Sequence, residues 1–205
     1  ESRLVGRTTR CNFPESAKIV TDIGAYTNPD FERLVAARPD LVLAPKIGVR
    51  PEFIQRIKSL KIPVYVDNSS NIPGIEQLIN NVGKLVGAET EANRIINDIN
   101  IRRNKIMKLM GGNEKPTVLF VIGIKPLVVA GGKSFLGALV REAGGSNIAE
   151  STAVEYPKFS IEEVIKRDPE VIVMLDKECR GQDCIKQWSD HGFLKAVKNH
   201  RVYVL

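Results

Sequence analysis

Residues 30–43 read Asp-Phe-Glu-Arg-Leu-Val-Ala-Ala-Arg-Pro-Asp-Leu-Val-Leu, and residues 160–173 read Ser-Ile-Glu-Glu-Val-Ile-Lys-Arg-Asp-Pro-Glu-Val-Ile-Val. The two stretches align without a gap. Each begins with a residue that favours the helix N-cap, Asp30 or Ser160, and continues as a short amphipathic helix. The chain therefore repeats one helix–turn–strand unit in its two halves.

The sequence also predicts where each helix ends and which strand follows it. Pro39 and Pro169 end the helices, because a proline ring disfavours helical geometry in the residue before it. An apolar segment follows each proline at once. These segments are too hydrophobic for a half-exposed strand, so we expect each to be buried in a parallel sheet.

The rest of the chain continues this alternation. Patterns of apolar residues predict helices over residues 51–60, 75–86 and 134–143, and strands over residues 64–66, 117–122 and 202–205. Strands that alternate with helices indicate α/β structure, with a parallel sheet and flanking helices in each half.

A long helix is predicted between the halves. Residues 89–110 carry apolar side chains near helical spacing and contain no glycine or proline. We therefore predict an N-terminal α/β lobe at 1–88, one long rigid interlobe helix at 89–111 and a C-terminal α/β lobe at 112–205. A ligand is expected in a cleft between the lobes, at the carboxyl ends of the strands.

Composition argues against several classes of protein. The 205 residues are 43% hydrophobic and carry a net charge of +6. The longest apolar runs, residues 117–122 and 171–175, are too short to cross a bilayer. Basic residues are scattered over helical segments with no aromatic-rich stripe, which favours a solvated surface over nucleic-acid binding. We expect a monomer that binds no nucleic acid.

The three cysteines allow more than one interpretation. Cys179 and Cys184 enclose a polar turn that could close as a disulfide, although two reduced thiols remain an alternative. The spacing makes a poor zinc site without a neighbouring histidine. Cys11 is then expected to be a small buried apolar residue.

No catalytic constellation is evident. The chain lacks nucleophile-elbow, P-loop and dinucleotide fingerprints, and the histidines at 191 and 200 lack metal-ligand spacing. Residues 130–134, Ala-Gly-Gly-Lys-Ser, are interpreted as a tight strand-to-helix turn with Ser134 as N-cap. We predict a protein that is not an enzyme and has no catalytic residues, no resident metal and no cofactor.

Candidate ligand residues are aromatic and lie in polar loops. Phe13, Tyr26 and Tyr156 occupy proline-containing loops, where an aromatic side chain is either a cleft wall or a packing anchor. Glu32 and Glu162 take equivalent places in the repeat. Either they complement the helix dipole or they present matched carboxylates to a two-fold partner.

Two groups of motifs carry a family resemblance. The first is Cys-Asn-Phe-Pro at 11–14 with Gly-Ala-Tyr-Thr-Asn-Pro at 24–29. The second is Ala-Gly-Gly-Lys-Ser-Phe-Leu-Gly at 130–137 with Tyr-Pro-Lys-Phe-Ser at 156–160. Together with the repeat, they resemble the class III periplasmic binding proteins, which serve ABC importers of cobalamin, ferric siderophores and haem. The resemblance runs through nearly the whole chain. It implies the fold of that class, truncated at both ends relative to its usual length.

The resemblance assigns partners and a location. It implies that Glu32 and Glu162 dock onto arginines of a dimeric membrane permease, with Glu163 as second choice for the C-terminal position. It also implies a periplasmic or extracellular, membrane-anchored lipoprotein.

The resemblance also assigns a ligand site. Tyr26 and Tyr156 match cleft-lining aromatics of the cobalamin branch, whereas Arg10 and Ile122 stand where that branch has aromatics. We place Arg10, Phe13, Tyr26, Lys46 and Tyr156 in the ligand site. The ligand is a cobalt- or iron-containing chelate, with a corrinoid as first choice. Arg10 and Lys46 favour carboxylates instead, as on haem or an anionic ferric siderophore. A molybdate-type oxyanion is a third option.

Overall fold

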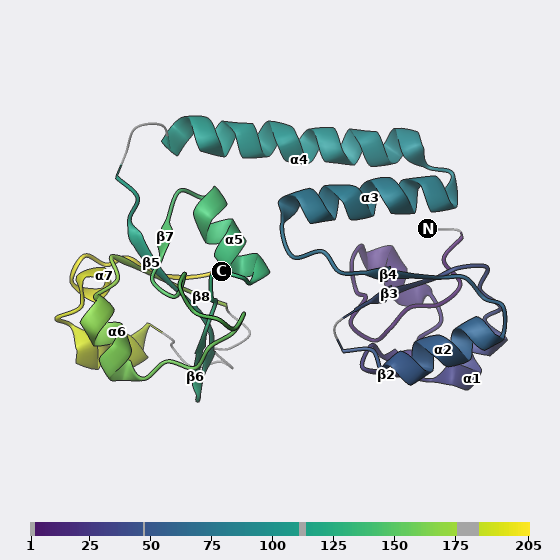
Figure 1. The fold of residues 1–205 in the computed structure, drawn as a ribbon, viewed down its shortest axis with the longest axis horizontal. Coiled ribbons are helices and arrows are strands. Elements are labelled where there is room, and N and C mark those ends of the chain that lie inside the picture. Colours follow the sequence, from purple (N-terminus) through teal and green to yellow (C-terminus); the bar gives the residue numbers. More distant parts are fainter. Residues whose placement is uncertain (1–2, 47, 111–113, 176–184) are drawn as a thin grey trace. The chain divides into compact units, whose positions relative to one another are not determined.

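A computed structural model describes residues 3–46, 48–110, 114–175 and 185–205. The chain forms two compact units, residues 1–68 and residues 69–205. Each unit has its own secondary structure, and the elements are labelled in Figure 1. Of the described helices, none is both long and apolar enough to cross a membrane.

The first unit is a small α/β assembly. Its central feature is a parallel pair of strands, β3 and β4, in which Leu43 lies opposite Tyr65. A short antiparallel hairpin, β1 and β2, precedes them. In chain order the elements are η1 (Glu15–Ile19), β1 (Gly24–Ala25), β2 (Asn28–Pro29), α1 (Phe31–Ala36), β3 (Val42–Pro45), α2 (Pro51–Ser59) and β4 (Val64–Asp67).

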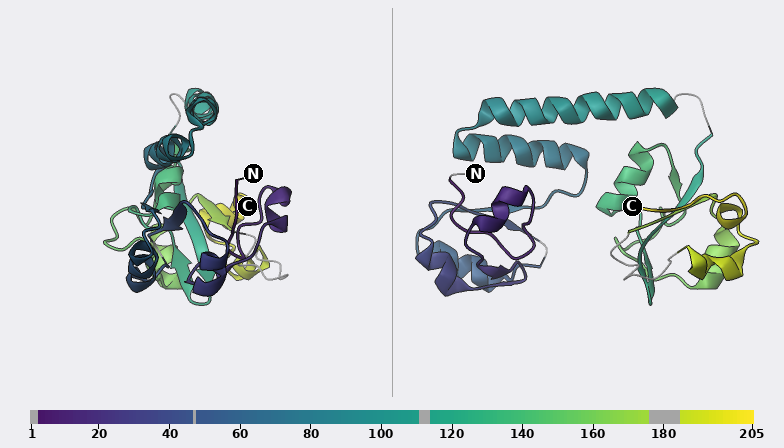
Figure 2. Two further views of the ribbon diagram at one scale, coloured as in Figure 1. Left: turned by 90° about the vertical axis from the view of Figure 1, so that its right-hand side faces the viewer. Right: turned by 180° about the vertical axis from the view of Figure 1, so that it is seen from behind.

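The second unit begins with two helices that lie side by side, α3 (Ile72–Val86) and α4 (Glu89–Met110) (Figures 1 and 2). The long helix predicted at 89–110 is confirmed. Close packing of the pair depends on Gly83, because an added Cβ there would lie 2.5 Å from the Cβ of Ala92. Gly87 ends α3 in the left-handed conformation, with φ 64°.

The boundary between the units differs from the predicted lobe boundary at residue 88. Helix α3 groups with the second unit because it packs along α4, so the division falls between Asn68 and Ser69. The assignment of functional lobes at 1–88 and 112–205 stays a prediction.

The second unit contains the larger sheet, in the order β6-β5-β8-β9, with β7 also paired to β5. Strands β7, β8 and β9 run parallel to their neighbours, as predicted, but β6 is antiparallel to β5. The predicted parallel sheet with flanking helices is therefore confirmed, and β6 adds an antiparallel edge strand that the sequence did not indicate. The remaining elements are β5 (Thr117–Ile124), β6 (Leu127–Val129), α5 (Phe135–Glu142), β7 (Ser146–Asn147), α6 (Ile161–Arg167), β8 (Val171–Met174), η3 (Lys186–His191), α7 (Lys195–Lys198) and β9 (Val202–Val204).

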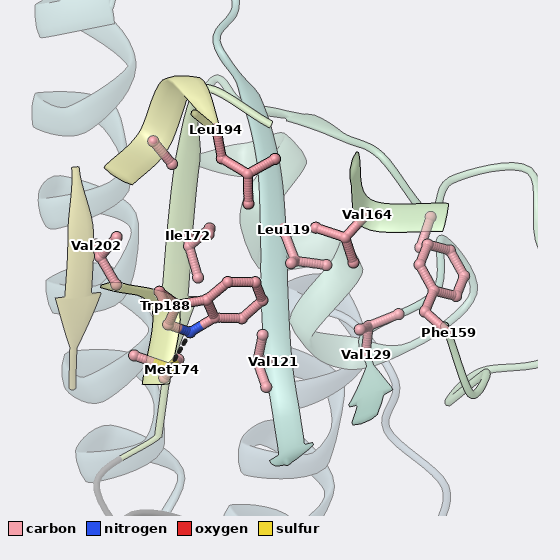
Figure 3. Close-up of a cluster of buried hydrophobic side chains, with 12 residues drawn as sticks. Leu119, Val121, Val129, Phe159, Val164, Ile172, Met174, Trp188, Leu194 and Val202 are labelled. Carbon is pink, nitrogen blue, oxygen red and sulfur yellow. Dashed lines mark hydrogen bonds between the residues drawn. The ribbon is translucent and has the colours of Figure 1, made fainter. Parts of the chain in front are cut away.

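Both faces of this sheet are covered. Helix α5 lies on one side of β5 and β8, and α6 and α7 lie on the other (Figures 1 and 2). Alternate residues of β5 serve the two cores: Leu119 and Val121 join one buried cluster, whereas Val118 and Phe120 join the other. The first cluster is the larger and includes Trp188, whose indole N–H lies 3.2 Å from the sulfur of Met174 (Figure 3).

The internal repeat is present as structure. Helix α1 leads to β3 in the first unit, and α6 leads to β8 in the second. Asp30 and Ser160 cap the two helices, as predicted, and accept hydrogen bonds from the backbone N–H three residues later at 3.0 and 3.2 Å. The residues before the two prolines, Arg38 and Asp168, both have positive φ, 47° and 39°. The two helices therefore end within one residue of the same repeat position, and a positive-φ residue precedes the proline in both copies.

The repeat differs in burial. Strand β8 is flanked by β5 and β9 and lies largely in the core. Strand β3 pairs only with β4 among the described residues, and its Leu43 side chain is 51% exposed. The prediction that both strands are buried was therefore wrong for β3, because burial depends on the layers around a strand and not on its own hydrophobicity.

Several local expectations can be compared with the structure. Ser134 caps α5 by accepting a hydrogen bond from the Gly137 N–H at 3.0 Å, which confirms the tight-turn interpretation of residues 130–134. Cys11 is exposed instead of buried, with its sulfur 3.2 Å from the Thr8 hydroxyl. Cys179 and Cys184 lie outside the described residues.

Candidate functional site

Tyr26 sits at the tip of the β1–β2 hairpin. The aspartate at 22 accepts a hydrogen bond from the Gly24 N–H at 2.7 Å, and Gly24 turns the chain with φ 92°. The ring of Tyr26 lies on the backbone of Gly48, where an added Cβ would approach the ring carbon Cε2 to 2.6 Å. The side chain is exposed but fixed on one side. An aromatic held in this way is suited to act as a wall for a flat ligand.

The predicted basic residues of the first unit lie in segments adjoining this hairpin. Thr9 donates its N–H to the Gly24 carbonyl at 2.9 Å, which places the loop containing Arg10 beside β1. Lys46 follows the carboxyl end of β3, and its N–H donates to the Asp67 carbonyl at 2.7 Å. Both side chains are exposed. The segment after Lys46 returns to the hairpin, since Gly48 contacts the Tyr26 ring.

Phe13 differs from the other candidates. Its side chain is 90% exposed, so within the described structure it does not anchor its loop by packing. An aromatic side chain with this exposure is accessible for contact with a ligand or a partner. Its place in the ligand site stays a prediction.

Tyr156 lies in the second unit, in a loop that runs beside β6. The backbone on both sides of it is hydrogen bonded: the Val129 N–H donates to the Pro157 carbonyl at 3.0 Å, and the Gly131 N–H donates to the Glu155 carbonyl at 2.8 Å. Partial burial, and secondly the charge of Glu155, raise the pKa of the Tyr156 phenol. The phenol therefore stays neutral near pH 7 and can donate a hydrogen bond.

Ile122, which stands where the cobalamin branch has an aromatic, is half-buried in β5 and packs against the smaller cluster of the core. Tyr26 and Tyr156 belong to different units, and a shared cleft stays a prediction. Sequence reasoning missed Arg50, which donates to the Asn28 side chain at 2.6 Å and ties the segment after β3 to the hairpin.

The two candidate docking residues occupy the same position in the two copies of the repeat. Glu32 and Glu162 are each the second residue of a capped helix, directly after the N-cap and first helical position of α1 and α6. Both side chains are exposed. At this position a carboxylate is stabilised by the positive end of the helix dipole.

The structure distinguishes Glu162 from its neighbour Glu163. Glu163 forms an ion pair with Arg167 at 2.6 Å, one turn along α6. Hydrogen bonds from the Ser160 hydroxyl and from its own backbone N–H lower the pKa of Glu162. A shallow pocket of about 440 Å³ is lined by Glu162, Glu163, Lys166 and Arg167. These contacts favour Glu162 over Glu163 as the residue that meets a partner.

Replacing Ser160 with alanine should raise the pKa of Glu162 toward its ordinary value. The lowered pKa means that this carboxylate stabilises the fold above the unfolded-state value of about 4.5, and that the contribution is lost as pH falls through the lower folded-state value. We therefore expect the stability difference between wild type and Ser160→Ala to narrow in acid. Loss of the cap costs a further ~1 kcal/mol at all pH values.

An NMR titration of the Glu162 carboxyl carbon measures this shift, with denaturant unfolding at pH 3 and pH 7 as companion. Ser189→Ala, at an exposed serine of η3, is the matched control. An unchanged Glu162 titration in Ser160→Ala would contradict the role given to the Ser160 hydroxyl.

Within the described residues, no group of three or more histidine, cysteine, aspartate or glutamate side chains is placed to hold a metal ion. Exposed tyrosines and basic side chains are the available ligand-contacting groups. They suit an organic ligand with a flat face or with carboxylates.

Comparison with known proteins gives one consistent result. A family model described as "Periplasmic binding protein" matches residues 1–205. The vitamin B12-binding protein of Vibrio parahaemolyticus is 24% identical over 203 residues, which are 99% of this chain and 73% of that protein.

Solved structures share the fold. The periplasmic vitamin B12-binding protein of Vibrio cholerae superposes with a TM-score of 0.84 at 20% identity, covering 98% of this chain and 78% of that one. A periplasmic haem-binding protein in complex with two haems gives a TM-score of 0.87 at 23% identity, covering 98% and 79%. These likenesses confirm the predicted fold class of two-lobed periplasmic binding proteins.

Proposed function

Because this chain belongs to the family of periplasmic binding proteins, we propose that it is the solute-binding component of an ABC importer. It acts outside the cytoplasmic membrane as a monomer, held there as a lipoprotein. It captures its ligand between two lobes and delivers it to a dimeric permease. No step in this cycle requires catalysis.

We propose a metal chelate as the ligand, with a corrinoid as first choice. One observation carries this choice: each unit presents an exposed tyrosine, Tyr26 or Tyr156, on a loop held by its own unit, at the positions that the resemblance assigns to cobalamin contacts. Flat aromatic faces suit the corrin ring, and a neutral phenol suits its amide side chains. The similarity to vitamin B12-binding relatives supports the same choice.

A second candidate is haem or an anionic ferric siderophore. Arg10 and Lys46 favour it, because both are exposed and adjoin the Tyr26 hairpin from two different segments. A guanidinium can bind a carboxylate with two parallel hydrogen bonds, and an ammonium adds a point charge. The amide side chains of a corrin ring carry no carboxylate that Arg10 or Lys46 could bind.

Calorimetric titration of the complete, ligand-stripped protein tests the proposal. Cyanocobalamin, haem and a panel of ferric siderophores are titrated separately. Submicromolar one-to-one binding of one of them establishes the function and identifies the ligand. Failure of all three classes would refute the chelate assignment and turn attention to oxyanions such as molybdate.

Truncating either tyrosine should weaken binding of the identified ligand. We expect Tyr26→Ala and Tyr156→Ala each to raise Kd by about tenfold to a hundredfold, which corresponds to ~1–3 kcal/mol for an aromatic that contacts the ligand centrally. Tyr203→Ala is the matched control, because Tyr203 is similarly exposed but lies on β9 and belongs to neither loop. If Tyr26→Ala and Tyr156→Ala bound the ligand with the same Kd as Tyr203→Ala, neither tyrosine would belong to the ligand site.

A further inference from the structure

The loop that carries Tyr156 lies directly against the Gly131-Gly132 turn. An added Cβ on Gly131 would lie 2.5 Å from the Val154 carbonyl oxygen and 2.6 Å from the Thr152 hydroxyl oxygen. On Gly132 it would lie 2.3 Å from the Glu150 carbonyl oxygen. All of these contacts are to the same loop, so the turn and the loop form one close-packed body.

A single buried side chain joins the two ends of this body. Asn147 is 4% exposed and lies in β7. Its Nδ2 donates to the Ala130 carbonyl at 2.8 Å, directly before the glycine turn. Its Oδ1 accepts from the Ala149 N–H at 2.9 Å, directly before the loop. The amide thus connects the segment leading into the turn with the segment leading into the loop.

The loop continues from this connection to Tyr156 through further hydrogen bonds. The Thr152 hydroxyl lies 2.8 Å from the Ala149 carbonyl oxygen and 3.2 Å from that of Val154. The Glu155 carbonyl then accepts from the Gly131 N–H. A chain of contacts therefore runs from Asn147 to the residue immediately before Tyr156.

We infer that Asn147 is a positioning residue for Tyr156, and that its amide preorganises the second unit's share of the ligand site. The inference rests on the proposed function for the part played by Tyr156. An amide suits this place because its Nδ2 donates to one backbone group while its Oδ1 accepts from another. An ionised aspartate keeps the acceptor and loses the donor, and an apolar residue leaves two buried backbone groups unpaired.

The first test needs no ligand. The titration of Tyr156 is followed by NMR with ring-labelled tyrosine, and the signal is assigned by comparison with Tyr156→Phe. Partial burial raises the pKa of Tyr156, so Asn147→Ala, which removes both amide hydrogen bonds without adding a charge and admits water to the loop, should lower it toward the ordinary tyrosine value. Asn199→Ala is the control, at an exposed asparagine that ends α7.

The second test uses the ligand identified by calorimetry. We expect Asn147→Ala to raise Kd about tenfold and to cause little further loss in a Tyr156→Ala background, because the two changes remove one contact. An unchanged Tyr156 titration in Asn147→Ala, or fully additive effects on Kd, would overturn the inference. A shifted titration in a protein that binds none of the tested chelates would support the positioning role and refute the proposed chelate ligand.

Thr152→Val is a second variant, for the case in which the Asn147 variant does not fold. It removes the hydroxyl that contacts two loop carbonyls but leaves both Asn147 hydrogen bonds in place. If Trp188 fluorescence shows that Asn147→Ala is unfolded, Thr152→Val must itself lower the pKa of Tyr156. Thr90→Val, at an exposed position of α4, must not shift it. A Thr152→Val protein with a wild-type Tyr156 titration would then overturn the inference.

Discussion

Replacing Glu32 and Glu162 together with alanine is expected to abolish transport while leaving ligand binding intact. Each carboxylate sits exposed at the second position of a capped helix, in the two copies of one repeat. A hydrogen-bonded ion pair with an arginine of the permease is worth about 1.5–3 kcal/mol on each side. Loss of both should reduce uptake by about a hundredfold or more.

Uptake is measured in proteoliposomes that contain the cognate permease, with Kd for the ligand measured in parallel. The chain offers a close control in Glu52, which is also an exposed second residue, on helix α2 outside the repeat. Glu52→Ala removes the same charge from the same helical position. Because α2 lies outside the repeat, this change should leave uptake unchanged. Normal uptake by the double variant with normal ligand binding would show that these glutamates do not dock.

The two single variants should each show an intermediate loss. In contrast, Glu163→Ala should have little effect, because Glu163 is engaged with Arg167 on its own helix. If Glu163→Ala instead matched the loss seen for Glu162→Ala, the assignment of the C-terminal docking residue would move by one position.

The second large effect concerns stability. Leu119→Ala is expected to destabilise the second unit by about 2–5 kcal/mol, because Leu119 is 0% exposed in the centre of β5 and its loss leaves a cavity. That is a large share of the 5–15 kcal/mol typical of a whole domain. Figure 3 shows Leu119 among the side chains of the larger cluster.

Leucine at 43 provides the matched comparison. It also lies within a parallel strand, β3, but its side chain is 51% exposed, so Leu43→Ala should cost less than about 1 kcal/mol. Urea unfolding followed by the single tryptophan, Trp188, reports the second unit, and circular dichroism reports the whole chain. Equal losses for the two variants would mean that Leu43 is as well buried in solution as Leu119.

Local features of the fold were predictable because they depend on neighbours in the chain. The caps at Asp30, Ser160 and Ser134 each satisfy a helical N–H three residues away, and short spacings of this kind are visible in sequence. The α4 helix was predictable for the same reason, since its apolar spacing and lack of glycine act within the segment itself.

The candidate ligand residues stay predictions, and the sequence did not indicate how the structure holds them. Tyr26 and Tyr156 were identified by loop motifs, whereas their supports, Gly48 and Asn147, were not. Gly48 is 22 positions along the chain from Tyr26, and nothing in its neighbours indicates a ring packed on its backbone. In the sequence, Asn147 is one polar residue after a Gly-Gly pair. Only the structure shows that it bonds to Ala130 and Ala149.

The sequence by itself determined the repeated helix–proline–strand unit, the capped helices that present Glu32 and Glu162, and the long helix α4. Each of these follows from local hydrogen bonding and side-chain periodicity. Only the tertiary structure decided that β6 turns back antiparallel, that β8 is buried where β3 is not, and that the Tyr156 loop is held by Asn147. Burial and loop position depend on which distant segments pack against a residue, and a single chain segment does not encode its own neighbours.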